Sequence, residues 1–337
     1  MSVFPDVKSF PMAMGKFLAV VCFSPFVTFA GLWREAQSMI SRTSHGKIRA
    51  VCTSGMKQIL LLTAQVMLVG MIAGAWIGSR REHDAYAEQV GRLRRAGALE
   101  MSSIPVGQAD NLPPPVARYL RRVLPATALI QEVWLRQVGV LKADLDSDRW
   151  MPFEAEHIVV PPATGFVWKA RVRVAPMLHI SVRDALIDRG GSGHVSLLSA
   201  FALKSDGGTM PMNSGSLHRY LAEAVWYPTA LLPGPNLRWS PIDATRSLAT
   251  LTNGKETVSL EFRFAASGEV TGIYTPGRWG TFDEGYRQVP WEGHFRNYRE
   301  WNGVVVPTEG DVGWQIHNEW QTVWKGRVTT YEVRLLR

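Results

Sequence analysis

The stretch FVWKARVRV at residues 166–174 alternates apolar and polar side chains with a period of two. Residues 258–264, VSLEFRF, alternate in the same way. Because successive side chains of a strand point to opposite faces of a sheet, this alternation predicts antiparallel strands with one buried face and one exposed face. Lys169, Arg171 and Arg173 are then expected on a solvated outer surface.

Similar but noisier runs extend the pattern through the C-terminal part of the chain, and turn signals such as Asn253-Gly254 and Asn302-Gly303 separate them. Roughly ten strands at this spacing predict a mainly β fold, built as one large curled antiparallel sheet or half-barrel. The further runs lie at residues 130–142, 153–160, 178–187, 194–203, 246–252, 269–276, 291–299, 304–316 and 322–336.

One helical segment interrupts the strands between Ser214 and Pro228. Its apolar side chains recur at the spacing of a helix face, which predicts an amphipathic helix that covers the open face of the sheet. A shorter helix at 116–124, preceded by three prolines, is expected to dock on the same body. The apolar side chains of the covering helix are Leu217, Tyr220, Leu221, Ala224 and Val225.

Residues 59–78, ILLLTAQVMLVGMIAGAWIG, contain no charged side chain. A helix of this length is about 30 Å long and matches the hydrocarbon thickness of a bilayer, so the stretch predicts a transmembrane helix. Gly70, Gly74 and Gly78 are four residues apart and form one face through which two such helices could pair as a dimer.

These elements divide the chain into four segments. Residues 1–55 form an N-terminal extension that contains a second apolar stretch at 17–33. The extension is either an additional membrane segment or the result of a wrongly assigned start, since Met56 opens an apolar run in the manner of a natural chain start. Residues 56–80 form the transmembrane helix, residues 82–111 a juxtamembrane helix and linker, and residues 112–337 the β body.

The formal net charge of +8 does not indicate a nucleic-acid partner. Residues 1–79 hold seven of the 37 basic and two of the 29 acidic residues, so the remaining chain carries 30 basic and 27 acidic residues. Most of the excess charge therefore flanks the apolar stretches, where it helps to set topology. A nearly neutral body does not favour binding to a phosphate backbone.

Two topologies remain open. With two membrane segments, the basic loop at 34–57 stays in the cytoplasm and the body is exported, whereas a single segment that starts at Met56 predicts the opposite orientation. Both cysteines, Cys22 and Cys52, precede the body, which therefore has no thiol to protect in an oxidising compartment. We expect a location in the cytoplasmic membrane, with the body on the exported side.

The sequence lacks the motifs of several enzyme classes. The eight histidines are scattered without a zinc-ligand spacing, so no metal is expected. Neither a P-loop nor a dinucleotide fingerprint occurs, and no cofactor is expected. Gly190-Gly191-Ser192-Gly193-His194 has His where a nucleophile elbow needs Gly, and it is interpreted as a hairpin turn.

Three blocks of this sequence resemble an uncharacterised, membrane-anchored bacterial protein family. The blocks are LPPPVARYL at 112–120, LHRYLAEAVWYPTALLP at 217–233 and YREWNGVVVPT at 298–308, and the resemblance covers about residues 112–335. The family has Glu where this chain has Asp311. More loosely, the strand-rich layout is similar in architecture to the half-barrel of lipoprotein carriers of the LolA/LolB type.

The covering helix holds most of the candidate ligand-binding residues. Arg219 and Glu223 are spaced to pair on the helix face opposite the apolar stripe, either as an ordinary surface ion pair or at the mouth of a cavity. Glu223 with Glu292, Glu309 or Asp311 could also form an acid–base pair. The full set of candidate ligand-binding residues is Arg219, Tyr220, Glu223, Trp226, Tyr227 and Trp291.

Three functions are compatible with these features. The body holds eleven of the 13 tryptophans, and a curled sheet lined with aromatic side chains could enclose an apolar ligand. We therefore expect a membrane-tethered, non-catalytic binding or carrier protein for a lipid or another apolar ligand. The alternatives are an envelope enzyme that uses carboxylates for acid–base hydrolysis, and an assembly module that pairs through its membrane helix.

Overall fold

A computed structural model describes residues 46–100, 112–125, 129–143, 145, 147–282 and 285–336, and for residues 46–57 and 60 it describes the backbone alone. The second apolar stretch at 17–33 and the linker expected at 102–111 lie outside the described residues. The helices are α3 (Gly46–Glu100), α4 (Pro114–Val123) and α5 (Met210–Glu223), with short 3-10 turns η2 (Pro161–Ala163), η3 (Ala224–Trp226) and η4 (Pro228–Leu231).

The strands account for most of the body. They are β1 (Leu129–Leu141), β2 (Met151–Val160), β3 (Gly165–Ala175), β4 (Leu178–Ile187), β5 (Gly190–Leu197), β6 (Phe201–Gly207), β7 (Leu237–Pro241), β8 (Arg246–Asn253), β9 (Glu256–Phe264), β10 (Val270–Phe282), β11 (Gly285–Trp301), β12 (Val304–Ile316) and β13 (Glu319–Leu336).

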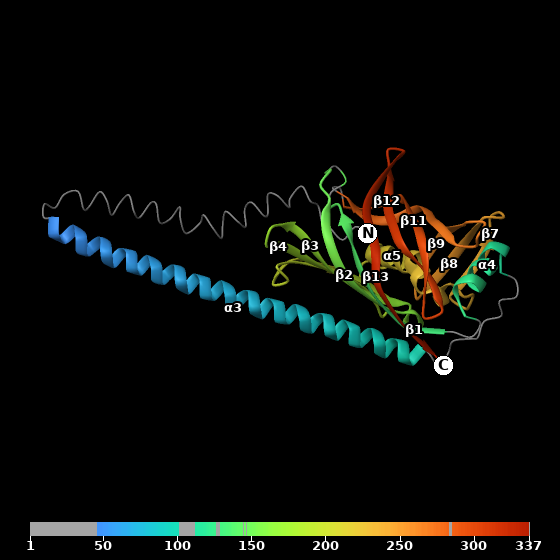
Figure 1. The fold of residues 1–337 in the computed structure, drawn as a ribbon, viewed down its shortest axis with the longest axis horizontal. Coiled ribbons are helices and arrows are strands. Elements are labelled where there is room, and N and C mark those ends of the chain that lie inside the picture. The colour runs from blue at the N-terminus through green and yellow to red at the C-terminus, as the bar shows by residue number, and fades with distance from the viewer. Residues whose placement is uncertain are drawn as a thin grey trace. The chain divides into compact units, whose positions relative to one another are not determined.

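One antiparallel sheet forms the body (Figure 1). Its thirteen strands follow the order β6-β5-β4-β3-β2-β1-β13-β12-β11-β10-β9-β8-β7. Two meanders therefore run outward from a central pair, β1 and β13, whose register extends from Leu129 opposite Leu336 to Leu141 opposite Trp324. The prediction of a mainly β fold with one large curled antiparallel sheet is confirmed.

Helix α5 lies on one face of this sheet and contacts both meanders. It packs against β4 and β5 on one side and against β9, β10 and β11 on the other. Because β5 and β9 are far apart in the strand order, the sheet must curl around the helix for both to touch it. We call the face that carries α5 the inner face and the opposite face the outer face.

The sequence predicted fewer strands than the structure contains. The run expected at 194–203 is two strands, since Leu198 and Ser199 adopt positive φ angles of 55° in a turn between β5 and β6. Strand β7 was not expected, because it has only five residues and ends at Pro241. β6 and β7 are the two edge strands, where short strands and proline are tolerated.

Helix α3 joins the expected transmembrane and juxtamembrane helices into one element that begins before Met56, and it crosses a boundary between two compact units. One unit ends at Gly78, and the body begins at Ser79. Within the described residues, one helical stretch, Leu61–Glu100, is long and apolar enough to cross a membrane, with a mean hydropathy of 1.8 in its most apolar window. The side chains of that window are exposed, as Val66 at 70% and Trp76 at 68% illustrate.

The part of α3 that belongs to the body packs on the outer face of the sheet. Val90 and Leu93 are buried against apolar side chains of β2, β3 and β4, including Ile158 and Val167. Two ion pairs flank this contact, from Arg94 to Glu132 at 2.7 Å and from Arg92 to Asp188 at 2.6 Å. The residues from Ser79 onward are therefore part of the body rather than a free tether.

Aromatic side chains fill the inner face around α5. The Phe153 ring stacks on Trp324 with centroids 5.7 Å apart, and it meets Trp168 edge-on at 6.1 Å. Trp226 contacts Phe295 at 6.1 Å in the same edge-on geometry. The tryptophans on this face therefore act mainly as packing, as their size and shape allow.

Candidate functional site

Four of the six predicted ligand-binding residues meet around one small space beneath α5. Arg219, Glu223, Trp226 and Trp291 line a space of about 20 Å³ together with other aromatic side chains. Such a space holds about one water molecule and is far smaller than a lipid chain. Arg219 and Glu223 lie one helical turn apart on α5, and Trp291 lies on β11. The packing of α5 against β11 therefore brings these residues together.

The two predicted tyrosines lie elsewhere and stabilise the helix terminus. The Tyr220 hydroxyl donates to the carbonyl oxygen of Pro161 at 3.2 Å, and the Tyr227 hydroxyl donates to the carbonyl oxygen of Tyr220 at 2.7 Å. Both rings are buried and pack against each other with centroids 5.3 Å apart. These contacts fix the 3-10 turn that follows α5.

Arg219 and Glu223 do not form a surface ion pair, contrary to one of the two interpretations of the sequence. The Arg219 side chain is only 5% exposed, and its Nε donates to Glu223 Oε1 at 2.9 Å. Its Nη1 donates to Asp184 Oδ2 at 2.8 Å, and its guanidinium lies over the rings of Phe166 and Trp168. Arg219 therefore joins two buried carboxylates from α5 and β4.

Burial changes the protonation of the groups around Arg219. It raises the pKa of Asp184 to about 6 and also raises that of Glu223, although Arg219 opposes both shifts. Burial lowers the pKa of His157 well below its usual value, and its Nε2 lies 3.6 Å from Glu223 Oε2, beyond hydrogen-bond reach. His157 is therefore neutral at neutral pH, whereas the carboxyl group of Asp184 titrates near pH 6.

A second buried arginine, Arg278, completes the polar cluster. Its Nη2 donates to the carbonyl oxygen of Gly215 on α5 at 3.0 Å. Its guanidinium lies over Trp291 at 4.7 Å and Trp314 at 5.4 Å from the ring centroids, and burial lowers its pKa to about 9. Arg278 is still a cation at neutral pH, so the cluster combines two cations with two carboxyl groups.

Several polar atoms of the cluster have no hydrogen-bond partner among the described residues. They include both ring nitrogens of His157, Oε2 of Glu223, and Nε and Nη1 of Arg278. A second space of about 50 Å³ is lined by Asp184, Arg219 and Arg278. Water molecules fit both spaces, but neither space is large enough for a ligand of lipid size.

Sequence reasoning missed Asp184, His157 and Arg278. Strand parity could have flagged the first two, because His157 falls on the buried parity of β2 and Asp184 has the parity of the apolar residues Ile180 and Val182 on β4. A polar residue at a buried strand position needs a partner, which is a signal in its own right. Arg278 follows an irregularity in the pairing of β10, so parity does not place it.

The carboxylates proposed as partners of Glu223 lie on the outer face instead. Glu292 accepts from Arg263 Nη1 at 2.5 Å, Glu309 accepts from Arg296 Nε at 3.1 Å, and Asp311 accepts from Arg296 Nη1 at 2.6 Å. These three acids therefore pair with arginines rather than with Glu223, because alternate residues of β11 and β12 point to opposite faces, although Asp311 also borders the space of about 20 Å³ that Glu223 lines. Asp184 is the carboxylate that shares Arg219 with Glu223.

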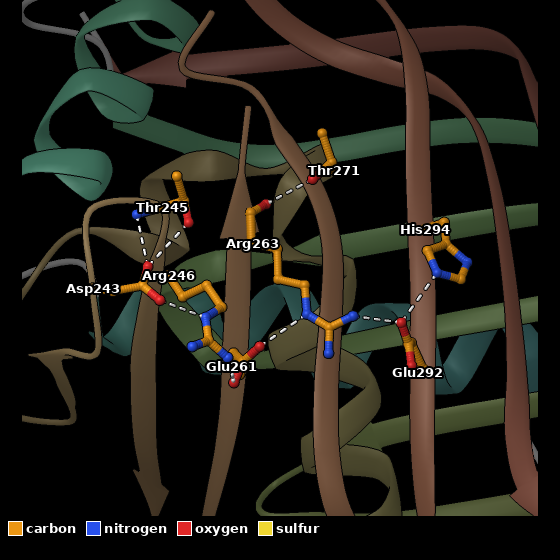
Figure 2. Close-up of polar contacts among 8 residues, drawn as sticks. All are labelled: Asp243, Thr245, Arg246, Glu261, Arg263, Thr271, Glu292 and His294. Atoms are coloured by element: carbon orange, nitrogen blue, oxygen red, sulfur yellow. Dashed lines mark hydrogen bonds and ion pairs between the residues drawn. The ribbon is translucent and has the colours of Figure 1, made fainter. Parts of the chain in front are cut away.

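An ion-pair network crosses the outer face from β8 to β12. Figure 2 shows Arg263 between Glu261 and Glu292, with Arg246 bound to Asp243 on one side and His294 bound to Glu292 on the other. His294 Nδ1 then reaches Asp311 Oδ1 at 2.9 Å. The acids of this surface are therefore already neutralised by neighbouring cations.

A groove on the outer face has a volume of about 830 Å³. Trp168 and Arg171 are three residues apart on β3, so Arg171 faces away from α5, as predicted for the basic strand positions. The groove is lined by Val138, Gly139, Val140, Pro152, Phe153, Glu154, Arg171, Arg173, Ala175, Met177, Leu178, His179, Arg296, Glu309, Lys325, Gly326 and Arg327. Among the described residues, no cluster of three or more His, Cys, Asp or Glu side chains could hold a metal ion.

Two solved structures are similar to this chain. One is a LolA superfamily protein from Nitrosomonas europaea, with 10% sequence identity, a TM-score of 0.37, and coverage of 66% of this chain and 93% of that chain. The other is a β-barrel-like protein of the DUF1849 domain of unknown function from Brucella abortus, with 8% identity, a TM-score of 0.20, and coverage of 62% and 100%. No curated protein matches the chain.

A family model matches residues 103–326, which is more than half of the chain. The matched range contains the three blocks at 112–120, 217–233 and 298–308, and with them α5 and the strands that surround it. On this match, the chain belongs to DUF6544, a family of unknown function.

Proposed function

We propose that this protein is a membrane-tethered, non-catalytic binding or carrier protein for a lipid or another apolar ligand. The observation that carries the proposal is the outer-face groove, whose volume of about 830 Å³ lies in the range of small-molecule sites. The apolar side chains Val138, Val140 and Leu178 contribute to its lining. The exposed apolar stretch of α3 supports attachment to a bilayer.

The groove replaces the aromatic inner face as the proposed binding site. An acyl chain needs a continuous apolar space, and the spaces of about 20 and 50 Å³ beside α5 are too small for one. Arg219, Glu223, Trp226 and Trp291 are accordingly proposed to hold α5 on the sheet rather than to touch the ligand.

Native mass spectrometry of the full chain in detergent tests this proposal. We expect a co-purified lipid or fatty-acid mass on the wild type and its loss in Ala175→Trp, because the indole would fill the groove. Ala266→Trp, at an exposed position outside the groove, is the matched control and should keep the adduct. A wild type without any adduct, or an adduct that survives Ala175→Trp, would contradict the proposal.

We further propose that the body lies on the periplasmic side of the bacterial cytoplasmic membrane. The body contains no cysteine, so a single Asp148→Cys substitution at a fully exposed side chain gives a unique reporter there. A membrane-impermeant maleimide should label this thiol in intact spheroplasts. Labelling that appears only after lysis would place the body in the cytoplasm.

A second candidate function is acid–base catalysis by Glu223 and Asp184. It is favoured by the raised pKa of both carboxyl groups, since raised values are typical of general acids. Glu223→Gln should then remove hydrolysis of an envelope substrate while the melting temperature stays close to the wild-type value. A variant that changes only stability would leave the cluster with a structural role.

A third candidate is assembly through the membrane helix. A side chain at Gly70 or Gly74 would have no heavy atom within 4 Å in the monomer, so both positions are open to a partner. Gly70→Leu and Gly74→Leu should abolish association in detergent, as judged by sedimentation, if the glycine face pairs two helices. Association that is unchanged would remove this mechanism.

A further inference from the structure

The groove on the outer face carries more positive than negative side chains. Its cations come from β3, β11 and β13, and its acids are Glu154 and Glu309. Burial and the neighbouring Arg171 lower the pKa of His179, so this side chain is neutral at neutral pH. Five cations therefore face two carboxylates across one space, and they are Arg171, Arg173, Arg296, Lys325 and Arg327.

Strand register explains how these charges come together. Directly opposite residues of neighbouring strands share a face of the sheet. One row of opposite residues crosses six strands on the outer face. Beside this row, Lys325 lies opposite Val140 on the same face. The row, from β11 to β3, consists of Arg296, Glu309, Arg327, Val138, Glu154 and Arg171.

The cations differ in how far they are already neutralised. Arg296 is bound by Glu309 and Asp311, and Arg171 contacts the ring of His179 at 3.2 Å. Arg173 and Arg327 are exposed and have no hydrogen-bond or ion-pair partner within the part of the chain that the structure describes. These two guanidinium groups are therefore available to a ligand, and guanidinium geometry suits a phosphate group.

Apolar side chains border the same charges. Met177 is 99% exposed in the turn between β3 and β4, where it adopts a positive φ of 61°. With Ala175 and Leu178 it forms an apolar rim next to Arg173. A ligand that matches this lining has an anionic group and an apolar portion within a few ångströms of each other, as a phospholipid does.

We infer that the groove binds the phosphate headgroup of an anionic lipid, with Arg173 and Arg327 as the principal contacts. This inference rests on the proposed lipid-binding function and adds the chemical class of the ligand. A cation close to an anionic headgroup contributes about fivefold to affinity, so the loss of two contacts should weaken binding about 30-fold. The apolar rim is expected to add affinity for a diacyl chain that a soluble phosphate ester lacks.

The test compares lipids added to the full chain in detergent, with binding read by native mass spectrometry. Dioleoyl-phosphatidylglycerol should bind the wild type more tightly than dioleoyl-phosphatidylcholine. The double variant Arg173→Gln/Arg327→Gln should lose about 30-fold in affinity for phosphatidylglycerol and none for phosphatidylcholine. The control Arg238→Gln/Arg299→Gln removes two exposed cations outside the groove and should bind both lipids as the wild type does.

The outcomes separate this inference from the proposed function. If the wild type binds neither lipid, the proposed function itself fails. If it binds both lipids equally, or if the double variant keeps full affinity for phosphatidylglycerol at an unchanged melting temperature, the anionic headgroup is refuted while lipid binding stands. If glycerol phosphate displaces phosphatidylglycerol at equal concentration, the groove recognises a soluble phosphate ester and the lipid assignment is overturned.

Discussion

Replacing Asp184 by Asn should change how the stability of the body depends on pH. The Asp184 residue is 8% exposed, and its carboxylate accepts a hydrogen bond from Arg219 at 2.8 Å. Burial raises its pKa to about 6 from the ordinary value of 3.8, with Glu223 adding to the shift and Arg219 opposing it. An Asn side chain keeps the volume and a hydrogen-bond acceptor but cannot titrate.

The sign of the effect follows from proton linkage. Between pH 4 and pH 6 the folded protein holds a proton on Asp184 that the unfolded chain has released, so stability falls as the pH rises through this window. Two pKa units correspond to about 3 kcal/mol in the free energy of unfolding. For a body of this size, that is a shift of about 6–12 °C in melting temperature.

The measurement is the difference in melting temperature between wild type and Asp184→Asn at a series of pH values from 4 to 7. The difference removes contributions of opposite sign, such as that of Asp311, whose pKa is lowered because hydrogen bonds from His294 and Arg296 outweigh its burial. The wild type should gain about 3 kcal/mol relative to the variant as the pH falls from 7 to 4. Asp148→Asn, at a fully exposed carboxylate, should give a flat difference.

A flat difference for Asp184→Asn would refute this reasoning, because it would show that Asp184 has the same pKa in the folded and unfolded states. A difference of the opposite sign would mean that Arg219 outweighs burial and holds the pKa below 3.8.

Three further substitutions test the packing by thermal and urea unfolding. Arg219→Met should lower the free energy of unfolding by about 3–5 kcal/mol, because it leaves two buried carboxylates without their cation. Neutralising both acids in the same variant should recover most of this loss. Leu93→Ala should cost about 2–5 kcal/mol if α3 is part of the body, whereas Leu99→Ala, at a side chain 79% exposed, should stay within about 0.5 kcal/mol. Gly139→Ala should cost about 1–3 kcal/mol, since its Cβ would overlap the backbone of β13, while Gly234→Ala has open space and should be neutral.

Much of the fold could be predicted because its determinants are local. The alternation at 166–174 predicted β3, and the helical spacing from Leu217 to Val225 predicted α5. The turns between these elements were harder to predict. The turn at Leu198 and Ser199 has no glycine to mark its positive φ angles, so two strands were expected to be one.

The candidate site beneath α5 could be predicted only in part. Arg219 and Glu223 are one turn apart, and that spacing is visible in the sequence, but their burial is not. Asp184 reaches Arg219 from 35 residues away, and this contact depends on how α5 lies over β4. An isolated helix pattern cannot distinguish a solvated ion pair from one that is covered on both sides.

The outer groove could not be predicted, because it is a property of strand order rather than of any one strand. Arg171, Arg296 and Arg327 each occupy an ordinary outward position in an alternating strand. They share one row because β13 returns to pair with β1, which brings residues from opposite ends of the body into adjacent strands. If β1 and β13 were not paired with each other, the same residues would form two separate solvated patches. The single long-range pairing that closes the two meanders into one sheet therefore also creates the cationic groove, and a change that weakens this pairing should reduce stability and anionic-lipid binding together.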